Sequence, residues 1–550
     1  MRRYNMIWPL AIVAIMVSCH KLSVPATTEK PDPTDTTRGV PVGPDYMKNM
    51  LKYRPHDGSM WDNWYVIKND EVHMFHLWGP LSNISYDYDV NLRGFGHAFT
   101  TDLLHWNEQP QVLSLVNAQT SYELDFHYSG CAYAWEGKYY MFYTMRRWNQ
   151  QRIGVAMSND LYSWERYSGN PVIEPDARWF IPISSQPEGW NGDDCRDMIV
   201  VKKSDGTGFY GYFVSSTTVL GYTSPTAAIG LAESSDLLNW KQKGIVYLPS
   251  GVSMPEMVDV FECNGRWYMT LTTAKNNGSL NVFSDPYVAR ATVYASSDTQ
   301  EGPFVENVND NVLLGGPILS GYSSRTVEFK GERRILYVDP DNGCGTICLP
   351  KTIGTTSEGY LRAYYASDLI PAIRIDKPTP TIYAQPNTSF AWPTHGGTWR
   401  VEGSRFICET DPNSWQPLLF NHHAQNMELF FNAHSSTCSS VGFVFSAHVA
   451  SPTLNDIRHI IVADSERNMV YLSNGQWELI CARAFNFGSS TEHTYRCILI
   501  GNTIEMYIDD ILAFEASLNA PDAYIPGIFA NDGKLEADEI EIYTLENTRS

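Results

Sequence analysis

The sequence predicts an all-β protein, in which a five-bladed β-propeller is followed by a C-terminal β-sandwich. Aromatic residues make up 13% of the 550 residues, and 39 Gly and 31 Pro suit many short strands joined by turns. A hairpin motif recurs five times at regular spacing. No long stretch shows the 3.6-residue period of an amphipathic helix. These three observations together favour repeated four-stranded sheets.

The first repeated unit is a small residue and Ala, a few polar residues, Asp-Leu and then Trp. Its copies are GHAFTTDLLHW (Gly96–Trp106), GVAMSNDLYSW (Gly154–Trp164) and GLAESSDLLNW (Gly230–Trp240), with a degenerate fourth copy in TVYASSDTQEGPF (Thr292–Phe304). The second unit is a turn followed by an aromatic strand, and its turns lie near residues 69, 136, 205, 264 and 331. The turns are about 65 residues apart, which is the length of a four-stranded propeller blade. The alternative is an open sandwich with irregular hairpins.

The repeats stop near residue 385, so we expect the propeller to span residues 44–385. A Pro/Gly/Asn-rich linker, AQPNTSFAWPTHGG, follows them. From about Thr398 the chain again alternates apolar and polar residues in short runs, but without the blade motif. Residues 390–550 are therefore predicted to form a two-sheet sandwich.

The N-terminal segment has the features of a bacterial export signal. Met1-Arg2-Arg3 is basic, Ile7 to Val17 is apolar apart from Pro9, and Met16-Val17-Ser18-Cys19 resembles a lipobox. We expect residues 1–18 to be a lipoprotein signal peptide and Cys19 to be acylated after cleavage. An ordinary signal peptide and an uncleaved anchor are the alternatives. Residues 19–43, rich in Pro, Thr and Asp, would then tether an exported protein to a membrane, in the periplasm or at the cell surface.

The formal net charge is −21, which makes nucleic acid a poor partner because its phosphates require Lys and Arg. Nine cysteines remain besides Cys19, and their spacing does not resemble a compact disulfide scaffold. Cys344 and Cys348 lack a second pair, so a zinc site is not expected. We predict buried thiols with at most one disulfide bridge, no metal site and no cofactor.

Three carboxylates fall at nearly the same depth of three predicted inner strands. Asp62 lies seven residues before Asn69, and Glu256 lies eight before Asn264. Asp197 likewise lies eight residues before the turn at Asp205. Since inner strands line the central funnel of a propeller, the three acids should converge there. Acids in otherwise apolar strands cost free energy unless they are used, and paired carboxylates are what glycosidic bond cleavage requires. The alternative is a structural role, bonded to backbone amides or a cation.

The ordered motifs SMWDNWYV, VHMFHLW, FGHAFTTDLLHW, HYSGCAYAW, CRDMIVV and PEMVDVF resemble those of glycoside hydrolase family 32, whose members act on fructans. The resemblance covers roughly residues 50–350, and the C-terminal part is similar to that family's sandwich module. It implies a retaining mechanism with Asp62 as nucleophile and Glu256 as acid/base. It also implies that Asp197, paired with Arg196, steadies the substrate and the transition state.

The sequence departs from the family pattern around these residues. Met198 follows the Arg-Asp pair in place of Pro, Met257 and Val258 follow the Glu in place of Cys-Pro, and Leu77 replaces an expected Gln. Fructose specificity is therefore less well supported than the chemistry. Family 43-like inverting cleavage of arabinose or xylose polymers, and glycan binding without catalysis, remain open alternatives.

The residues predicted to bind the carbohydrate are Arg196, Trp61, Asn63, Trp78 and Ser129. Trp61 and Trp78 offer aromatic faces on which sugar rings stack, although core packing is an equal alternative for each. Ser129 holds the corresponding position in the second blade. His97 is expected to support its blade, and Asp193 and Asp194 to lie in a solvated loop. The oligomeric state cannot be predicted from these patterns.

Overall fold

The computed structural model describes the chain from Met50 onward with gaps. The described residues are 50–56, 58–80, 94–114, 122–123, 126–147, 150–181, 195–218, 226–250, 255–274, 285, 287–288, 290–307, 309–316, 321–339, 345–378, 389–390, 397–412, 414–449, 454–518 and 523–548. The predicted signal peptide, Cys19 and the tether lie outside them, as do Asp193 and Asp194.

The first part of the described chain forms five antiparallel sheets in sequence order. Blade one contains β2 (Gly58–Lys68), β3 (Glu71–Pro80), β4 (Phe95–Thr100) and β5 (His105–Val112), with β1 (Met50–Leu51) paired to β5. Blade two contains β6 (Phe126–Trp135), β7 (Lys138–Arg147), β8 (Gln150–Ser158) and β9 (Glu165–Arg166). Blade three contains β10 (Cys195–Lys202), β11 (Phe209–Thr217), β12 (Thr226–Ser234) and β13 (Lys241–Tyr247).

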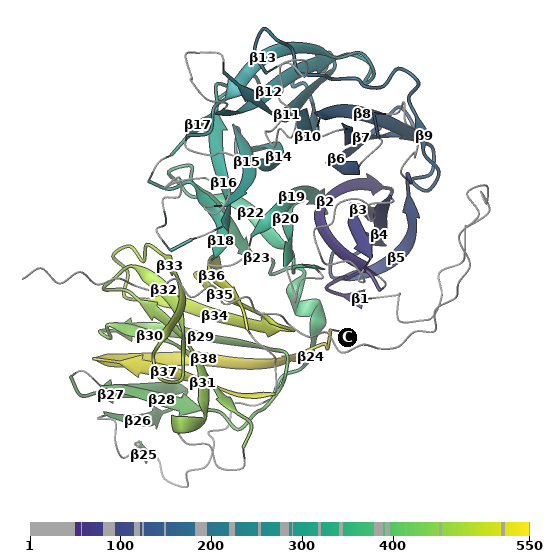
Figure 1. Ribbon diagram of the computed structural model, residues 1–550. Helices are drawn as coiled ribbons and strands as arrows, with labels where there is room; N and C mark the ends of the chain where they lie inside the picture. The colour runs from purple at the N-terminus through teal and green to yellow at the C-terminus, as the bar shows by residue number, and fades with distance from the viewer. Residues whose placement is uncertain are drawn as a thin grey trace, which may run out of the picture. The chain divides into compact units, whose positions relative to one another are not determined.

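Two further blades complete the ring. Blade four contains β14 (Glu256–Cys263), β15 (Arg266–Ala274), β16 (Arg290–Ser297), β17 (Val305–Glu306) and β18 (Val312–Gly316). Blade five contains β19 (Tyr322–Phe329), β20 (Glu332–Asp339), β22 (Lys351–Thr355) and β23 (Leu361–Tyr365), with β21 (Thr346–Ile347) paired to β20. Figure 1 shows the five sheets around a common centre, with β2, β6, β10, β14 and β19 nearest to it. The predicted propeller is therefore confirmed.

The two sequence repeats form two kinds of turn. In the Asp-Leu repeat, the Asp160 carboxylate accepts hydrogen bonds from the backbone of Tyr162 and Ser163, each 2.8 Å long. Leu161 is fully buried with φ of 76°, and Trp164 Nε1 donates to its carbonyl at 3.0 Å. The hairpin repeat places consecutive positive φ angles in the turn, as at Glu136 (49°) and Gly137 (76°). This is the type I′ geometry that matches the twist of paired strands.

A short 3₁₀ helix, η6 (Ile370–Ile373), and β24 (Arg374–Asp376) follow the blades. One sandwich sheet contains β25 (Ser389–Phe390), β26 (Gly397–Glu402), β27 (Arg405–Thr410), β29 (Met427–Ser436), β34 (His493–Ile500), β35 (Thr503–Ile508), β36 (Ile511–Ser517) and β38 (Lys534–Leu545). The other contains β28 (Trp415–Leu419), β30 (Ser440–Ala447), β31 (Ile457–Asp464), β32 (Met469–Asn474), β33 (Leu479–Ala484) and β37 (Tyr524–Asn531), with η7 (Leu454–Asp456) before β31. The sandwich is thus also confirmed.

The hydrophobic cores follow this architecture. Separate buried clusters lie between blades one and two, blades two and three, and blades three and four. Another fills the space between the two sandwich sheets. The remaining large cluster joins blades five and one to sandwich residues such as Ile498 and Leu512. Tyr364 of β23 also pairs with Ile511 of β36, so the last blade continues directly into the sandwich.

Candidate active site

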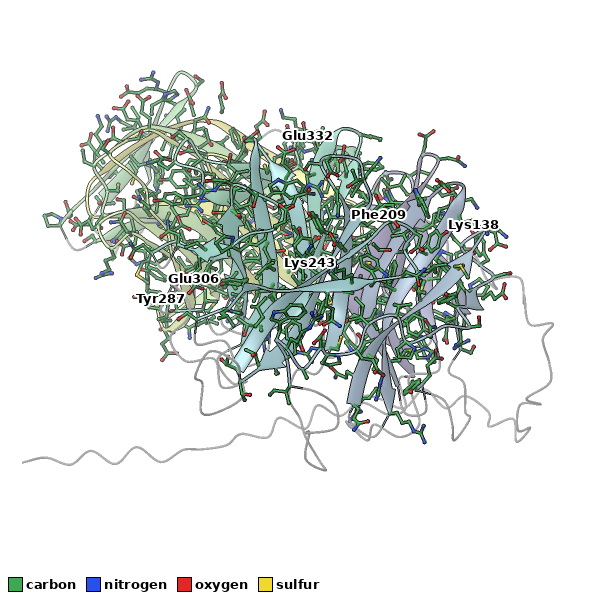
Figure 2. All side chains as sticks on the ribbon, turned by 90° about the horizontal axis from the view of Figure 1, so that it is seen from above. Lys138, Phe209, Lys243, Tyr287, Glu306 and Glu332 are labelled. Carbon is green, nitrogen blue, oxygen red and sulfur yellow. The ribbon has the colours of Figure 1, made fainter. Side chains whose placement is uncertain are left out.

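Each of the five innermost strands carries an irregularity close to its N-terminal end. The pairing with the second strand of the blade shifts between Trp61 and Asn63, Tyr128 and Gly130, Arg196 and Ile199, Glu256 and Asp259, and Tyr322 and Arg325. β-Bulges redirect side chains and are common beside active sites. Lys138, Phe209 and Glu332, labelled in Figure 2, begin the second strands β7, β11 and β20 and so mark the opposite end of the blades. The predicted acids all lie at the bulged end.

Asp62 and Asp197 are linked to neighbouring blades by short hydrogen bonds. Ser323 Oγ donates to Asp62 Oδ1 at 2.6 Å, and Ser129 Oγ donates to Asp197 Oδ1 at 2.6 Å. The second oxygen of Asp197 accepts the backbone N–H of Met257 at 2.9 Å. Asp197 is only 2% exposed and has φ of 54°, whereas Asp62 is partly exposed. The structure thus brings residues of blades one, two, three, four and five to one place.

Arg196 joins the two remaining members of the predicted site. Its Nε lies 3.7 Å from Asp197 Oδ2, and its terminal Nη2 lies 3.5 Å from Glu256 Oε1. The same Nη2 donates to the carbonyl oxygen of Pro255 at 2.8 Å, which fixes the guanidinium beside β14. The Glu256 side chain is 23% exposed, so it is accessible from the funnel. A cation placed between two carboxylates lowers their mutual repulsion.

The pKa of Asp62 is raised above its usual value. Burial is the larger cause, and the negative charge of Asp197 adds to it. Hydrogen bonds from Ser323 and Ser129 and the positive charge of Arg196 oppose this rise. Hydroxyl donors and a guanidinium favour the ionised carboxylate, whereas a second carboxylate disfavours it. On balance the surroundings of Asp62 disfavour its ionised form relative to a free carboxylate, while the two hydroxyl groups and Arg196 limit the rise of its pKa.

Blade five supplies the functional neighbours that the sequence motifs did not reveal. The Tyr322 hydroxyl donates to Glu256 Oε2, and Ser323 contacts Asp62 as described. Arg325 is 2% exposed and donates to the carbonyl oxygens of Val258, Gly130 (3.2 Å) and Asp197 (3.4 Å). No local pattern marks these residues. Only their position on β19, at the same depth as the acids of other blades, could have indicated them.

The predicted carbohydrate-binding residues occupy different depths. Trp61 is 37% exposed, whereas Trp78 is partly buried. Trp78 packs against Gly58, and a Cβ added to that glycine would lie 2.2 Å from Trp78 Nε1. Asn63 is fully buried and donates to the carbonyl oxygen of Ser323 at 2.8 Å. Ser129 is 1% exposed and bonded to Asp197. Of these residues, Trp61 offers the most accessible face to a sugar ring. The contact of each of these residues with a substrate stays a prediction.

The residues that depart from the family pattern lie in the cores between blades. Leu77, Met198 and Val258 are 1%, 0% and 0% exposed. Met198 packs against Gly211, at which an added Cβ would come 2.1 Å from its Cε. An apolar side chain in such a place strengthens blade packing through burial. Of the three, Leu77 places an apolar core contact where the family pattern has the polar Gln.

The spacing from the turns predicted that Asp197 and Glu256 hold equivalent positions on their inner strands. In the structure the two positions differ by one residue. The residues with positive φ in the bulges are Asp197, Met257 and Ser323, so Glu256 corresponds to Arg196 and Tyr322. Counting back from the turns misses this because the β10–β11 turn runs from Lys202 to Phe209, whereas Cys263 pairs with Arg266 across a two-residue turn. The acids still converge because the bulges re-aim them.

The histidine and cysteine side chains near the blades have structural surroundings. His97 is fully buried, stacks on Phe75 with ring centroids 4.6 Å apart, and lies 2.9 Å from His73 through their ring nitrogens. Seven of the eight cysteines within the described ranges are buried. Among the described residues no group of His, Cys, Asp or Glu is arranged to hold a metal ion. No helix in that part of the chain is long and apolar enough to cross a membrane.

A five-bladed propeller with two aspartates and a glutamate gathered at one end of its inner strands is an arrangement suited to glycoside hydrolysis. Residues 53–313 match the family model described as the glycosyl hydrolases family 32 N-terminal domain. The predicted resemblance to that family is thereby confirmed for residues 53–313.

Solved structures with the same fold span both parts of the chain. A GH32 beta-fructofuranosidase from Bombyx mori is 16% identical with a TM-score of 0.62, covering 92% of this chain and 95% of that one. A fructofuranosidase from Schwanniomyces occidentalis complexed with fructose is 16% identical with a TM-score of 0.62, covering 92% and 100%. Fructan 1-exohydrolase IIa from Cichorium intybus is 14% identical with a TM-score of 0.63, covering 92% and 99%. At these identities the likeness shows the shared fold.

Proposed function

We propose that the protein hydrolyses the glycosidic bond of a fructan-type substrate with retention of configuration. The observation that carries the proposal is the convergence of Asp62, Asp197 and Glu256 in the funnel of a domain that matches family 32. Similar structures are those of fructofuranosidases and of a fructan 1-exohydrolase in complex with 1-kestose. Two carboxylates with different surroundings are the minimum for this reaction.

In the proposed mechanism, Glu256 donates its proton to the glycosidic oxygen while Asp62 attacks the anomeric carbon. The bond to the leaving group breaks, and a covalent glycosyl-enzyme forms. Glu256, now ionised, takes a proton from water, whose oxygen attacks the anomeric carbon and releases Asp62. Arg196 lies beside Glu256 and favours its ionised form after the first step.

Asp197 has a different part in the proposal because its two oxygens are already fixed by Ser129 and the Met257 amide. A carboxylate oxygen has more than one lone pair, so each can still accept a hydroxyl hydrogen of a sugar. Held rigidly by these contacts, Asp197 would stabilise the positive charge that develops at the anomeric centre. The exposed face of Trp61 would stack on the sugar ring.

The experiment is a substrate screen with the purified protein on inulin, levan, sucrose, arabinan and xylan. Fructose release from at least one of the first three is expected, with NMR showing the configuration of the first-formed anomer to be retained. Release of arabinose or xylose with inversion would replace the proposal with the family 43-like alternative. Binding of a glycan without turnover would show a non-catalytic carbohydrate-binding protein.

We also propose that the protein is exported and acylated at Cys19, on the grounds of the lipobox-like Met16–Cys19 and the polar tether after it. Replacing Cys19 with Ala should move the protein from the membrane fraction to the soluble fraction. Retention in the membrane with an uncleaved N-terminus would contradict acylation and show a plain anchor. The net charge of −21 supports the further proposal that nucleic acid is not a partner.

A further inference from the structure

Within the described residues of blade five, the inner strand β19 carries no acid at the depth of Asp62 and Glu256, but two of its consecutive residues contact the two acids of the proposed reaction. Ser323 Oγ donates to Asp62 Oδ1 at 2.6 Å, and the Tyr322 hydroxyl donates to Glu256 Oε2. We infer that Tyr322 and Ser323 are positioning residues that together hold the nucleophile and the acid/base at their working separation. This inference rests on the proposed function and names the part of the fold that sets its geometry.

Adjacent residues of a regular strand point to opposite faces of the sheet, so one dipeptide cannot normally reach two groups in the same funnel. The bulge in β19 removes this restriction. Tyr322 pairs with Val338 and Arg325 pairs with Leu336, which leaves two residues of β19 opposite one residue of the partner strand, Tyr337. Ser323 within the bulge has φ of 53°, in the left-handed region that a serine seldom adopts. Such strain at a functional site is maintained by the surrounding contacts.

Contacts from two other blades fix the dipeptide in this conformation. Asn63 Nδ2 donates to the Ser323 carbonyl oxygen at 2.8 Å, so the neighbour of the nucleophile anchors the backbone of the serine. Arg290 of β16 lies over the Tyr322 ring, with its guanidinium carbon 5.1 Å from the ring centroid. A cation over an aromatic face is attracted by the ring. Blades one and four, which bear the two acids, thus also hold the residues that contact them.

The two contacts act on the acids in ways that suit their proposed roles. The hydroxyl of Ser323 favours the ionised form of Asp62, and this hydrogen bond lowers its pKa against the effects of burial and Asp197. The Tyr322 hydroxyl occupies Glu256 Oε2, while Arg196 Nη2 lies 3.5 Å from Oε1. The carboxyl group of Glu256 is therefore held between two donors and cannot rotate freely. Loss of either contact would loosen one acid relative to the other.

The test compares Ser323→Ala, Ser323→Gly and Tyr322→Phe with the wild type and with the matched control Ser324→Ala. Ser324 is the next serine on β19, is 1% exposed, and bonds to Thr292 at 2.7 Å rather than to an acid. Both Ser323 variants remove the hydroxyl, but glycine relieves the positive φ whereas alanine retains it. If the hydroxyl acts on Asp62, the two variants shift in the same direction.

For both Ser323 variants, the acid limb of the kcat/KM profile should move up by about one pH unit, with kcat about tenfold lower and KM little changed. Tyr322→Phe should lower kcat by about tenfold with a wild-type acid limb, since it leaves Asp62 untouched. Ser324→Ala should match the wild type in both quantities. The inference would be overturned if both Ser323 variants kept the acid limb and the kcat of the wild type. It would also be overturned if the acid limb shifted in Ser323→Ala but not in Ser323→Gly.

A second measurement separates this inference from the proposed function. The Asp62 carboxyl is titrated by ¹³C NMR in the wild type and in Ser323→Ala, with Asp62→Asn to assign the signal. A higher Asp62 pKa in Ser323→Ala supports the contact even if no glycan is hydrolysed by the wild type. An unchanged pKa in a folded variant overturns the role of Ser323 even if fructan hydrolysis is established.

Discussion

The two aspartates of the funnel are chemically distinct because their neighbours differ. Asp197 is almost fully buried and holds hydrogen bonds at both carboxylate oxygens, so it cannot move toward a substrate. Asp62 is partly exposed and accepts a bond from Ser323 at one oxygen. The rigid group suits stabilisation of charge, whereas the accessible group suits attack on carbon.

At the residue scale we predict that Asp62→Asn and Glu256→Gln each lower kcat by about a thousandfold or more, because each removes a group that acts in the bond-breaking step. Asp197→Asn should also lower kcat strongly. The assay is fructose release from the substrate that the screen identifies, with circular dichroism to check folding. Asp205→Asn, in the exposed β10–β11 turn, is the control and should keep wild-type activity. Three acid variants with wild-type rates would contradict the assignment of the site.

At the scale of the elements, the inner strands depend on one buried guanidinium. Arg325 of β19 donates to backbone carbonyl oxygens of β14, β6 and β10, namely those of Val258, Gly130 and Asp197. Asp197 and Val258 lie within the bulges of their strands, and Gly130 directly follows the bulge of β6. One side chain thus ties the bulged regions of three blades together.

We predict that Arg325→Met lowers the free energy of unfolding by about 3 kcal/mol, because it leaves buried carbonyl groups without donors. Urea unfolding measures the change. Arg333→Met on the neighbouring strand is the matched control, since Arg333 is 27% exposed, and it should cost no more than about 0.5 kcal/mol. Equal stabilities of the two variants would show that Arg325 does not hold the inner strands.

At the scale of the whole molecule, a buried cluster of charges lies where blade five meets the sandwich. Lys351 Nζ donates to Glu505 Oε1 at 2.6 Å and lies 3.8 Å from Glu515 Oε2. Lys52 Nζ donates to Thr503 Oγ1 at 2.8 Å. Burial raises the pKa of Glu515 to about 8, and the charge of Lys52 only partly opposes it. Glu515 is therefore protonated at neutral pH, and Lys351 is bonded to Glu505.

The pKa of Glu515 gives a pH dependence of stability with a definite sign. The folded protein keeps this proton up to about pH 8, whereas the unfolded chain releases it near 4.5, so stability falls as pH rises between these values. Glu515→Gln removes the effect. Its advantage over the wild type should grow from near zero at pH 4.5 to on the order of 4 kcal/mol at pH 8. Glu332→Gln, at an exposed position, should show no such trend in the same unfolding series.

The shared core predicts how the propeller behaves when residues 44–386 are expressed alone. Ile498, Ile500 and Leu512 of the sandwich pack in one cluster with Leu361 and Tyr365 of blade five. Removing the sandwich exposes these blade residues, at about 1.5–3 kcal/mol for each large side chain. We expect a much lower melting temperature than that of the full chain, but an unchanged KM in the folded fraction. A fragment as stable as the full chain would contradict the role of the shared core.

Much of the fold could be predicted because its signals are local. The Asp-Leu repeat specifies a turn through Asp160 and Leu161, and the Glu136-Gly137 pair specifies a hairpin. Each signal lies within a few residues and repeats with the blade, so their count gives the architecture. The acids Asp62, Asp197 and Glu256 could be located for the same reason, since each interrupts an apolar strand at a fixed distance from a turn.

The tertiary structure alone decided how the acids are held. Ser323 and Asp62 are 261 residues apart, and Arg325 and Gly130 are 195 apart, so no local pattern records either contact. Glu256 also lies one position away from the equivalent of Asp197. Counting back from the turns missed this because the turn lengths differ between blades three and four. The sequence by itself determined which strands form and which acids they carry, since both follow from short-range periodicity. Closure of the ring determined which hydroxyls and guanidinium groups meet those acids, because only it brings the first and last blades together.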